Sequence, residues 1–197
     1  MTDERTLEVR RQLFHLVLGC VITIAVWLLK PVYGNLILAP LVTVIILLLA
    51  LPHMAPNLIV SDHLLTHFER KHDVKTFPYK GAIYYGIGIF FPIALLTTEV
   101  ACVIILILSV GDALSTLIGK FYGKCRIGGK SIEGTMAFII SCFLASVIFL
   151  TITGRFDLLK TALGLTAAGA LLELQPVIND NLAVPIGLTL AARLAGL

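Results

Sequence analysis

Long apolar runs separated by short polar stretches dominate this chain. Seven runs stand out, and they cover residues 13–29, 34–51, 81–97, 99–118, 135–153, 157–172 and 182–196. An α-helix needs about 20 apolar residues to cross a bilayer, so the fourth and fifth runs are the clearest spans. The last two are rich in small residues, which predicts either short spans or broken helices packed within the protein. The pattern predicts an all-α, polytopic membrane protein of about seven transmembrane helices.

Composition agrees with a membrane protein and excludes several other classes. The chain has 197 residues, of which 58% are hydrophobic and only 14% charged. Soluble domains carry about 25% charged residues, so most of this surface must face lipid. The formal net charge of +3 is too small to predict a nucleic-acid partner. We expect residues 1–197 to form a single integral membrane domain of undetermined oligomeric state.

The longest polar segment, residues 52–80, has a partly amphipathic pattern. Apolar and charged residues alternate there at roughly helical spacing, which predicts a helix lying in the membrane interface at about 55–75. His63 and His67 are four residues apart, as in a two-histidine metal face, but the HExxH pattern is absent. A solvated interfacial helix is therefore favoured over a metal site.

Basic residues indicate the orientation of the chain. The N-terminal segment and the 52–80 and 119–134 loops together hold eleven Lys and Arg residues, whereas the other side holds four. Because Lys and Arg accumulate in cytoplasmic loops, we expect a cytoplasmic N-terminus. The first residues carry both signs of charge and no cleavage site follows the first apolar run, which predicts a permanent anchor. The four cysteines lack metal-ligand spacing and predict neither a disulfide framework nor a zinc site.

Asp112 interrupts an otherwise apolar run, VACVIILILSVGDALSTLIGK, near its basic end. An ionisable residue inside a membrane helix is energetically costly and marks a candidate functional site. The alternative is a structural carboxylate paired with a lysine of the next loop. Gly111 before it would allow close approach of a neighbouring backbone or a ligand.

The following loop, GKFYGKCRIGGKSIEGT at 119–135, combines five glycines with four basic side chains. Free backbone N–H groups and ammonium groups suit a polyphosphate, and a helix beginning near Ser131 would direct its positive end at it. The sequence GGKS is not a P-loop, because that motif needs glycine where this chain has Lys124. Alternatively, the lysines of this loop serve only to mark the cytoplasmic side of the membrane.

Further polar residues fall on the same predicted membrane face. His15 enters the first helix, Glu173 ends the sixth, and Asp180 and Asn181 precede the seventh. Mg²⁺ is usually held by one or two carboxylates together with phosphate oxygens and water. Carboxylates from several segments opposite a basic loop therefore indicate a site for a magnesium-bound nucleotide.

Five stretches in order resemble one known family. They are RRQLFH at 10–15, KGAIYYGIG at 80–88, GDALSTLIGKFYGK at 111–124, KSIEGT at 130–135 and ELQPVINDNLAVP at 173–185. Together, over nearly the whole chain, they resemble the CTP-dependent lipid-alcohol kinases, which include dolichol kinase, phytol and farnesol kinase, and the CTP-using diacylglycerol kinase. The resemblance implies transfer of the γ-phosphoryl group of CTP to a membrane lipid alcohol at the cytoplasmic face, with Mg²⁺ or another divalent cation.

The resemblance and the charge pattern together give a set of predicted site residues. The predicted nucleotide-binding residues are Lys120, Gly123, Lys124, Gly128, Gly129, Lys130, Ser131, Gly134, Thr135 and Asn181. The predicted metal ligands are Asp112, Glu133, Glu173 and Asp180. Asp112, Glu133 or, less favoured, His15 is expected to accept the proton of the lipid hydroxyl.

Two other functions compete with a kinase. A cytidylyltransferase would use CTP to form a CDP-activated lipid from a phosphatidic acid, but its His-Gly-Gly and Asp-Arg-x-x-Asp arrangement is not found here. A small transporter without chemistry would place polar groups near the bilayer midplane, often in two repeats. Here they gather at one face and no repeat is visible. The apolar runs do not choose among dolichol, shorter polyprenols, phytol-like alcohols and diacylglycerol.

Overall fold

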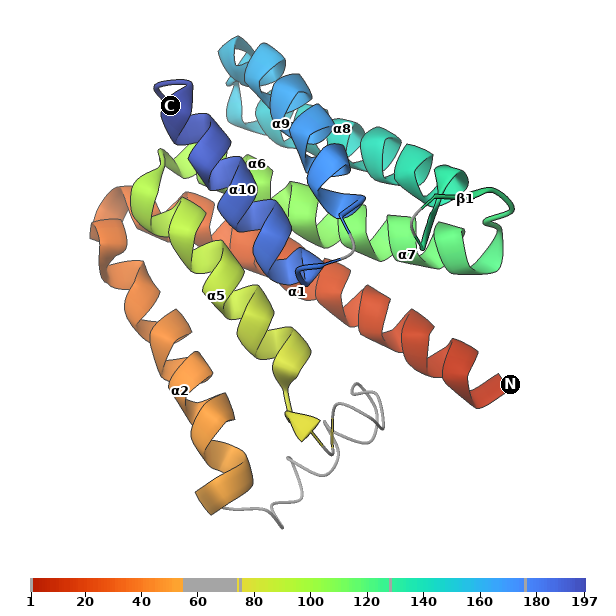
Figure 1. Ribbon diagram of the computed structural model, residues 1–197. Coiled ribbons are helices and arrows are strands. Elements are labelled where there is room, and N and C mark those ends of the chain that lie inside the picture. Colours follow the sequence, from red (N-terminus) through yellow and green to blue (C-terminus); the bar gives the residue numbers. More distant parts are fainter. Residues whose placement is uncertain (1, 55–73, 75, 128, 176) are drawn as a thin grey trace.

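A computed structural model describes residues 2–54, 74, 76–127, 129–175 and 177–197 of the chain. The predicted interfacial segment, with His63 and His67, lies almost wholly outside the described residues, and so does Gly128. The helices of the described part are α1 (Thr2–Tyr33), α2 (Leu38–Met54), α5 (Lys80–Leu95), α6 (Thr98–Leu106), α7 (Asp112–Phe121), α8 (Ile132–Thr153), α9 (Leu159–Glu173) and α10 (Asp180–Leu194) (Figure 1). A π-helical turn, η2 (Ile107–Gly111), joins α6 to α7 without a break.

Each predicted apolar run corresponds to one helical segment, and the all-α fold is confirmed in the described ranges with one small addition. The strands β1 (Arg126–Ile127) and β2 (Lys130–Ser131) form an antiparallel hairpin, with Arg126 opposite Ser131. Short 3₁₀ turns, η1 (Gly34–Ile37) and η3 (Phe156–Leu158), connect α1 to α2 and α8 to α9. The largest difference in boundary is α1, which begins well before the first apolar run.

Within the described ranges, three stretches are long and apolar enough to cross a membrane: Arg5–Pro52, Thr98–Phe121 and Ile132–Thr153. The helix Lys80–Leu95 is apolar but shorter. The helices α9 and α10 have 15 residues each, and a helix of that length rises only about 22 Å, less than the roughly 30 Å of a hydrocarbon core. The count of seven spans therefore remains a prediction.

The continuous segment α6–η2–α7 forms the centre of the molecule (Figure 1). Every residue from Val100 to Leu108 is buried. α1 packs against this segment, α8 packs along α7 and η2, and α10 packs against α5 and α9. Side chains on the outside of α1, α2 and α8 are apolar and exposed, as expected of a surface covered by lipid.

Two of the tightest helix contacts depend on glycine. A Cβ atom at Gly88 of α5 would lie 2.0 Å from the carbonyl oxygen of Asn181 at the start of α10. A Cβ atom at Gly111 would lie 2.4 Å from Sγ of Cys142 in α8. No side chain fits at either position, so the two glycines allow α10 to pack closely on α5 and α8 to pack closely on η2.

The connections bring several helix ends to one side of the bundle, which we call the polar end. The first turns of α1 lie there beside the end of α7 and the β1–β2 hairpin, and α9 ends there where α10 begins (Figure 1). Ser131 caps α8 at this end, where its Oγ accepts a hydrogen bond from the Gly134 N–H (3.0 Å). The C-terminus of α10 lies at the opposite end.

Candidate functional site

A polar cavity of about 300 Å³ lies at the polar end. Side chains from α1, α7, the hairpin, α9 and α10 line it, although these elements are far apart in sequence. The lining residues are Arg11, Gln12, Asp112, Ser115, Thr116, Gly119, Lys120, Arg126, Gly129, Lys130, Ser131, Gly134, Glu173, Asn179, Asp180 and Asn181. Nine of these belong to the predicted set, namely Asp112, Lys120, Gly129, Lys130, Ser131, Gly134, Glu173, Asp180 and Asn181.

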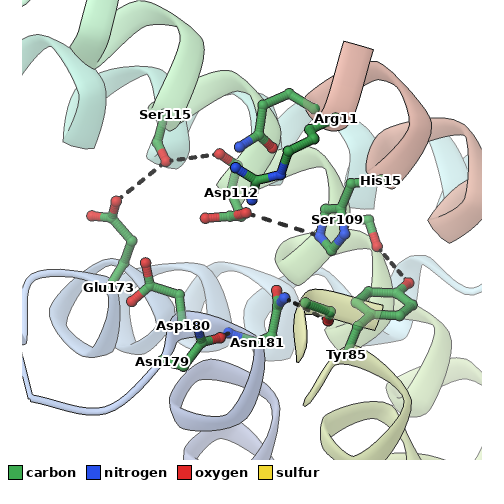
Figure 2. A network of polar contacts seen from close by, with 12 residues as sticks. Arg11, His15, Tyr85, Ser109, Asp112, Ser115, Glu173, Asn179, Asp180 and Asn181 are labelled. Carbon is green, nitrogen blue, oxygen red and sulfur yellow. Dashed lines mark hydrogen bonds and ion pairs between the residues drawn. The ribbon is translucent and has the colours of Figure 1, made fainter. Parts of the chain in front are cut away.

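Asp112 is the first residue of α7 and follows the π-helical turn directly. A π-helical turn is rare and often occurs at functional sites, because its extra residue changes where the next side chains point. Figure 2 shows the Asp112 side chain directed toward Arg11, His15 and Asn181. Its side chain is mostly buried, with 17% of its surface exposed. The predicted intramembrane carboxylate thus faces the cavity.

Lys130 joins two of the predicted metal ligands. Its Nζ donates to Oε1 of Glu173 at 2.8 Å and to Oδ2 of Asp180 at 2.7 Å. Glu173 is almost fully buried and also accepts a hydrogen bond from Ser115 Oγ at 3.2 Å (Figure 2). A buried carboxylate needs such partners, because its charge is costly to remove from water.

The electrostatics of this cluster follow from its partial burial. Burial of the Asp180 carboxyl raises its pKa to about 6, although the hydrogen bond from Lys130 opposes that shift. For Lys130, burial alone would lower the pKa, but the hydrogen bonds to Asp180 and Glu173 outweigh it and raise the pKa. Lys130 therefore stays charged, while Asp180 titrates close to neutral pH.

His15 lies on the other side of Asp112. Its Nε2 is 4.0 Å from Oδ2 of Asp112, which is too far for a direct hydrogen bond. The imidazole ring packs edge-on against Tyr85, with 4.6 Å between ring centroids. Ser109 Oγ donates to the carbonyl of Ile105, so the Tyr85 hydroxyl donates to Ser109 Oγ at 2.9 Å. Tyr85 and Ser109 thus hold the histidine ring in place beside Asp112 (Figure 2).

Glu8 of α1 does not line the cavity but binds three residues that do, and the sequence did not reveal it. Lys120, predicted to bind phosphate, forms an ion pair with it. Arg11 Nη1 and Gln12 Nε2 also donate to Glu8, at 3.2 and 3.1 Å. Glu8, Arg11 and Gln12 are three and four residues apart, so they are neighbours on one helix face. This spacing is the feature of the sequence that could have indicated their pairing. These pairs also explain why α1 extends through its charged beginning.

The glycines of the 119–135 loop mainly allow close packing. A Cβ atom at Gly123 would lie 2.3 Å from the Gly119 carbonyl oxygen, and one at Gly134 would lie 2.8 Å from the Ser115 carbonyl oxygen. The N–H of Gly134 is already bound by Ser131. Gly129, by contrast, lines the cavity and has a φ of 93°, with open space where a side chain would stand. Of the described glycines of this loop, only Gly129 combines an open backbone with a place at the cavity wall.

Four described residues of the predicted loop set lie outside the cavity lining, namely Gly123, Lys124, Glu133 and Thr135. Glu133 accepts a hydrogen bond from the backbone N–H of Lys124 at 3.0 Å, which ties the loop to the start of α8. The side chain of Lys124 is exposed. Thr135 Oγ1 donates to the carbonyl of Ser131 at 3.3 Å. The structure does not bring these residues together with Asp112, Glu173 and Asp180.

Unpaired polar atoms gather where the predicted site residues meet. In the described part of the chain, six buried side-chain nitrogen or oxygen atoms have no hydrogen-bond partner. Four belong to predicted site residues, namely His15 Nε2, Glu133 Oε2, Glu173 Oε2 and Asn181 Oδ1. Glu133 lies outside the cavity lining, but Glu173 and Asn181 line the cavity and His15 lies beside Asp112. Buried polar atoms are normally paired, so the three unpaired atoms of these residues point to a ligand there.

The oxygen-rich wall of the cavity fits Mg²⁺ only as a partner of a phosphate. Among the described residues, no three His, Cys, Asp or Glu side chains lie close enough to form a metal cage. Mg²⁺ needs only one or two carboxylates when phosphate oxygens and water complete its shell. Asp112, Glu173 and Asp180 offer carboxylate oxygens at one cavity and meet that requirement.

An apolar groove of about 700 Å³ adjoins the polar cavity. Helices α1, α2 and α5 line it almost entirely with apolar side chains. The two spaces share four residues, Arg11, Gln12, Asp112 and Asn181. Asp112 therefore lies at the boundary between a polar cavity suited to charged groups and an apolar space suited to hydrocarbon.

Comparisons with known proteins identify similar chains. An uncharacterized protein of Methanocaldococcus jannaschii is 33% identical over 90% of this chain and 88% of its own length. A phytol kinase of Synechocystis is 31% identical over 94% of this chain and 78% of its own length. A dolichol kinase of Saccharomyces cerevisiae is 36% identical over 44% of this chain and 18% of its own length. No family model matches the chain. No solved structure matches it.

Proposed function

Because the chain belongs to the family of lipid kinases that includes phytol kinase and dolichol kinase, we propose that it transfers the γ-phosphoryl group of CTP to the hydroxyl group of a membrane lipid alcohol. One observation carries the proposal: Asp112 lies where a cavity rich in carboxylates and basic residues meets an apolar groove. A kinase for lipid alcohols needs these two environments side by side.

The polar cavity is proposed to bind the nucleotide phosphates. Lys120, Lys130 and Arg126 line it and supply positive charge, and the open backbone at Gly129 allows close approach of phosphate oxygens. Glu173 and Asp180, with one oxygen of Asp112, would hold Mg²⁺, which neutralises charge that builds up on the phosphates. Lys130, which now pairs with both acidic residues, would then pair with phosphate oxygens.

In the proposed reaction, the oxygen of the lipid hydroxyl forms a bond to the γ-phosphorus of CTP. The bond between that phosphorus and the oxygen bridging it to the β-phosphate breaks, and CDP leaves with the bonding electrons. The hydroxyl proton passes to Asp112, whose carboxylate lies at the boundary of the two spaces. Most of the rate enhancement would come from positioning and charge neutralisation, as is usual for phosphoryl transfer.

The proposal is tested with purified protein in liposomes that contain single candidate acceptors. γ-Labelled CTP or ATP is added with Mg²⁺, and label in the lipid fraction is measured for isoprenoid alcohols, diacylglycerol and phosphatidic acid. The proposal predicts labelled lipid with at least one alcohol, and more from CTP than from ATP. A CDP-lipid formed from phosphatidic acid, with label released as pyrophosphate, would instead identify a cytidylyltransferase.

A further inference from the structure

The apolar groove beside Asp112 exists because α1 and α2 pack on different partners. α1 packs against α6, η2 and α7, whereas α2 packs against α5, and the turn η1 joins the two helices. Figure 1 shows α1 and α2 diverging from η1 toward the polar end. The groove occupies the space between them and α5. Its polar lining residues, among them Arg11, His15 and Asp112, are at the polar end.

The groove is long. His15 lines it near the polar end and Tyr33 lines it near η1. Both residues belong to α1, and the helix rises about 27 Å between them at 1.5 Å per residue. A bilayer's hydrocarbon core is about 30 Å thick. A tail lying in the groove could therefore extend beyond one leaflet without leaving the protein.

The groove is also open on its side. Phe14 and Leu29 of α1 and Val44 of α2 line it and are about half exposed. All three lie in the stretch that is apolar enough to cross a membrane, so the opening faces hydrocarbon. A lipid can enter from the bilayer by this opening without exposing its tail to water, which would cost about 0.8 kcal/mol for each methylene group.

We propose that this groove binds the tail of the acceptor, a single-chain lipid alcohol that enters sideways between α1 and α2. The inference rests on the proposed function, because an acceptor alcohol is what the groove would have to supply to Asp112. The apolar groove continues directly into the polar cavity, because the two spaces share lining residues. A tail in the groove therefore places its head group beside the cavity residues that are proposed to bind phosphate.

The geometry at the polar end fits a hydroxyl group. His15 Nε2 and Asp112 Oδ2 are 4.0 Å apart, and the His15 nitrogen is buried without a hydrogen-bond partner. A hydroxyl oxygen placed between them can lie at hydrogen-bond distance, about 2.8 Å, from both atoms. His15 is thus a positioning residue in this proposal, and Asp112 receives the proton.

Blocking the groove part of the way along tests the proposal. Ala25 of α1 lines the groove, and it lies about 15 Å along the helix from His15. Ala25→Trp should leave the short alcohol geraniol as an acceptor but reduce turnover of geranylgeraniol by at least about tenfold, since each excluded methylene group removes about a fourfold factor in affinity. The matched control is Ile24→Trp, because Ile24 is exposed on α1 and does not line the groove.

Retained turnover of geraniol by Ala25→Trp would show that the variant is folded. Equal loss of turnover for geranylgeraniol in Ala25→Trp and Ile24→Trp, or none in either, would overturn the groove assignment while leaving the kinase activity of the native protein in place.

A second measurement does not depend on catalysis. Geranylgeraniol with a diazirine at the end of its tail is photocrosslinked to the native protein without nucleotide, and labelled peptides are identified. Label should fall between residues 29 and 48, where the end of α1, η1 and α2 line the groove. Label on α8 or α9, or equal labelling by a phospholipid with the same group, would overturn the proposal. Label in the groove without any phosphorylation by the native protein would refute the proposed function alone.

Discussion

At the scale of single residues, Asp112 and Lys130 have separate tasks. Asp112 lies between the polar cavity and the apolar groove, with His15 4.0 Å away. Lys130 holds together two acidic residues from α9 and α10. In the proposed function Asp112 accepts the hydroxyl proton, whereas Lys130 both binds phosphate and stabilises the fold, so the two residues should respond differently to substitution.

Replacing Asp112 with Asn should abolish turnover without unfolding the protein. The amide keeps the shape of the side chain but cannot accept the hydroxyl proton, and loss of a general base typically lowers rates by about 10²–10⁴-fold. Phosphate transfer and thermal unfolding in detergent are measured on the same preparation. If Asp112→Asn had full activity, Asp112 would have no part in the mechanism.

Replacing Lys130 with Met should destabilise the folded protein. The variant leaves the buried Glu173 carboxylate without a cation, and breaking a buried ion pair typically costs about 3–5 kcal/mol. The double variant Lys130→Met/Glu173→Gln should recover much of the unfolding temperature but remain inactive. A single variant as stable as the native protein would show that the ion pair contributes nothing to the fold.

The pH profile should report Asp180. Its pKa is raised to about 6, so turnover should rise as the pH increases through 6 and the carboxylate forms. The pKa is higher in the folded protein than in the unfolded chain, so the same ionisation lowers the free energy of unfolding between about pH 4 and pH 6. In an Asp180→Asn variant, the free energy of unfolding should no longer fall between about pH 4 and pH 6. An unchanged stability profile would contradict the assignment.

Part of the site could be predicted from single residues and part could not. Asp112 was visible because a carboxylate inside an apolar run has few structural explanations. Glu8 was not, because its ion pair with Lys120 joins residues 112 positions apart and depends on how α1 packs against α7. The proximity of Glu173 and Asp180 through Lys130 also depends on packing that no local pattern encodes.

At the scale of elements, glycine contacts determine where the site residues stand. Gly88 of α5 lies directly against the backbone of Asn181, and the glycines around Ser131 let α7 and α8 approach. The sequence predicted a glycine-rich cradle for phosphates here. The structure shows a β-hairpin with tightly packed glycines, of which Gly129 keeps an open backbone at the cavity. Composition alone does not distinguish these uses of glycine.

Gly88→Ala should displace the start of α10. The added Cβ atom would lie 2.0 Å from the Asn181 carbonyl oxygen, so α10 must shift and carry Asn181 and Asp180 with it. We expect both turnover and thermal stability to fall. Gly164→Ala in α9 is the matched control, because a Cβ atom there meets nothing within 4 Å and the substitution should be neutral or stabilise by up to about 1 kcal/mol. Equal behaviour of the two variants would contradict the close contact between α5 and α10.

At the scale of the whole molecule, the polar end and the η3 turn lie at opposite ends of α8. Cys125 is exposed beside the hairpin, whereas Phe156 and Asp157 lie in η3. With the polar end cytoplasmic, a membrane-impermeant maleimide should label Cys125 only in inside-out vesicles. In a Cys125→Ser background, Asp157→Cys should react only in right-side-out preparations. Labelling of both positions from one side would contradict a spanning α8.

The general architecture followed from the apolar runs, since each run became one helical segment. The number of helices that cross the bilayer did not, because α9 and α10 are short and partly buried against their neighbours. The apolar groove was also beyond prediction, since it arises from the packing of α1 and α2 on different partners. That groove adjoins the polar cavity through the residues that line both spaces.

The proposed phosphoryl transfer is tested most directly by following the α- and γ-phosphorus atoms of CTP separately. The native protein is incubated with Mg²⁺, a lipid alcohol and CTP labelled at either the α or the γ position, and the lipid products are separated. If the chain transfers the γ-phosphoryl group of CTP, γ label should enter the lipid, α label should leave as CDP, and both results should depend on Asp112. Entry of α label into lipid, or no entry of either label with any alcohol, would contradict the proposed transfer.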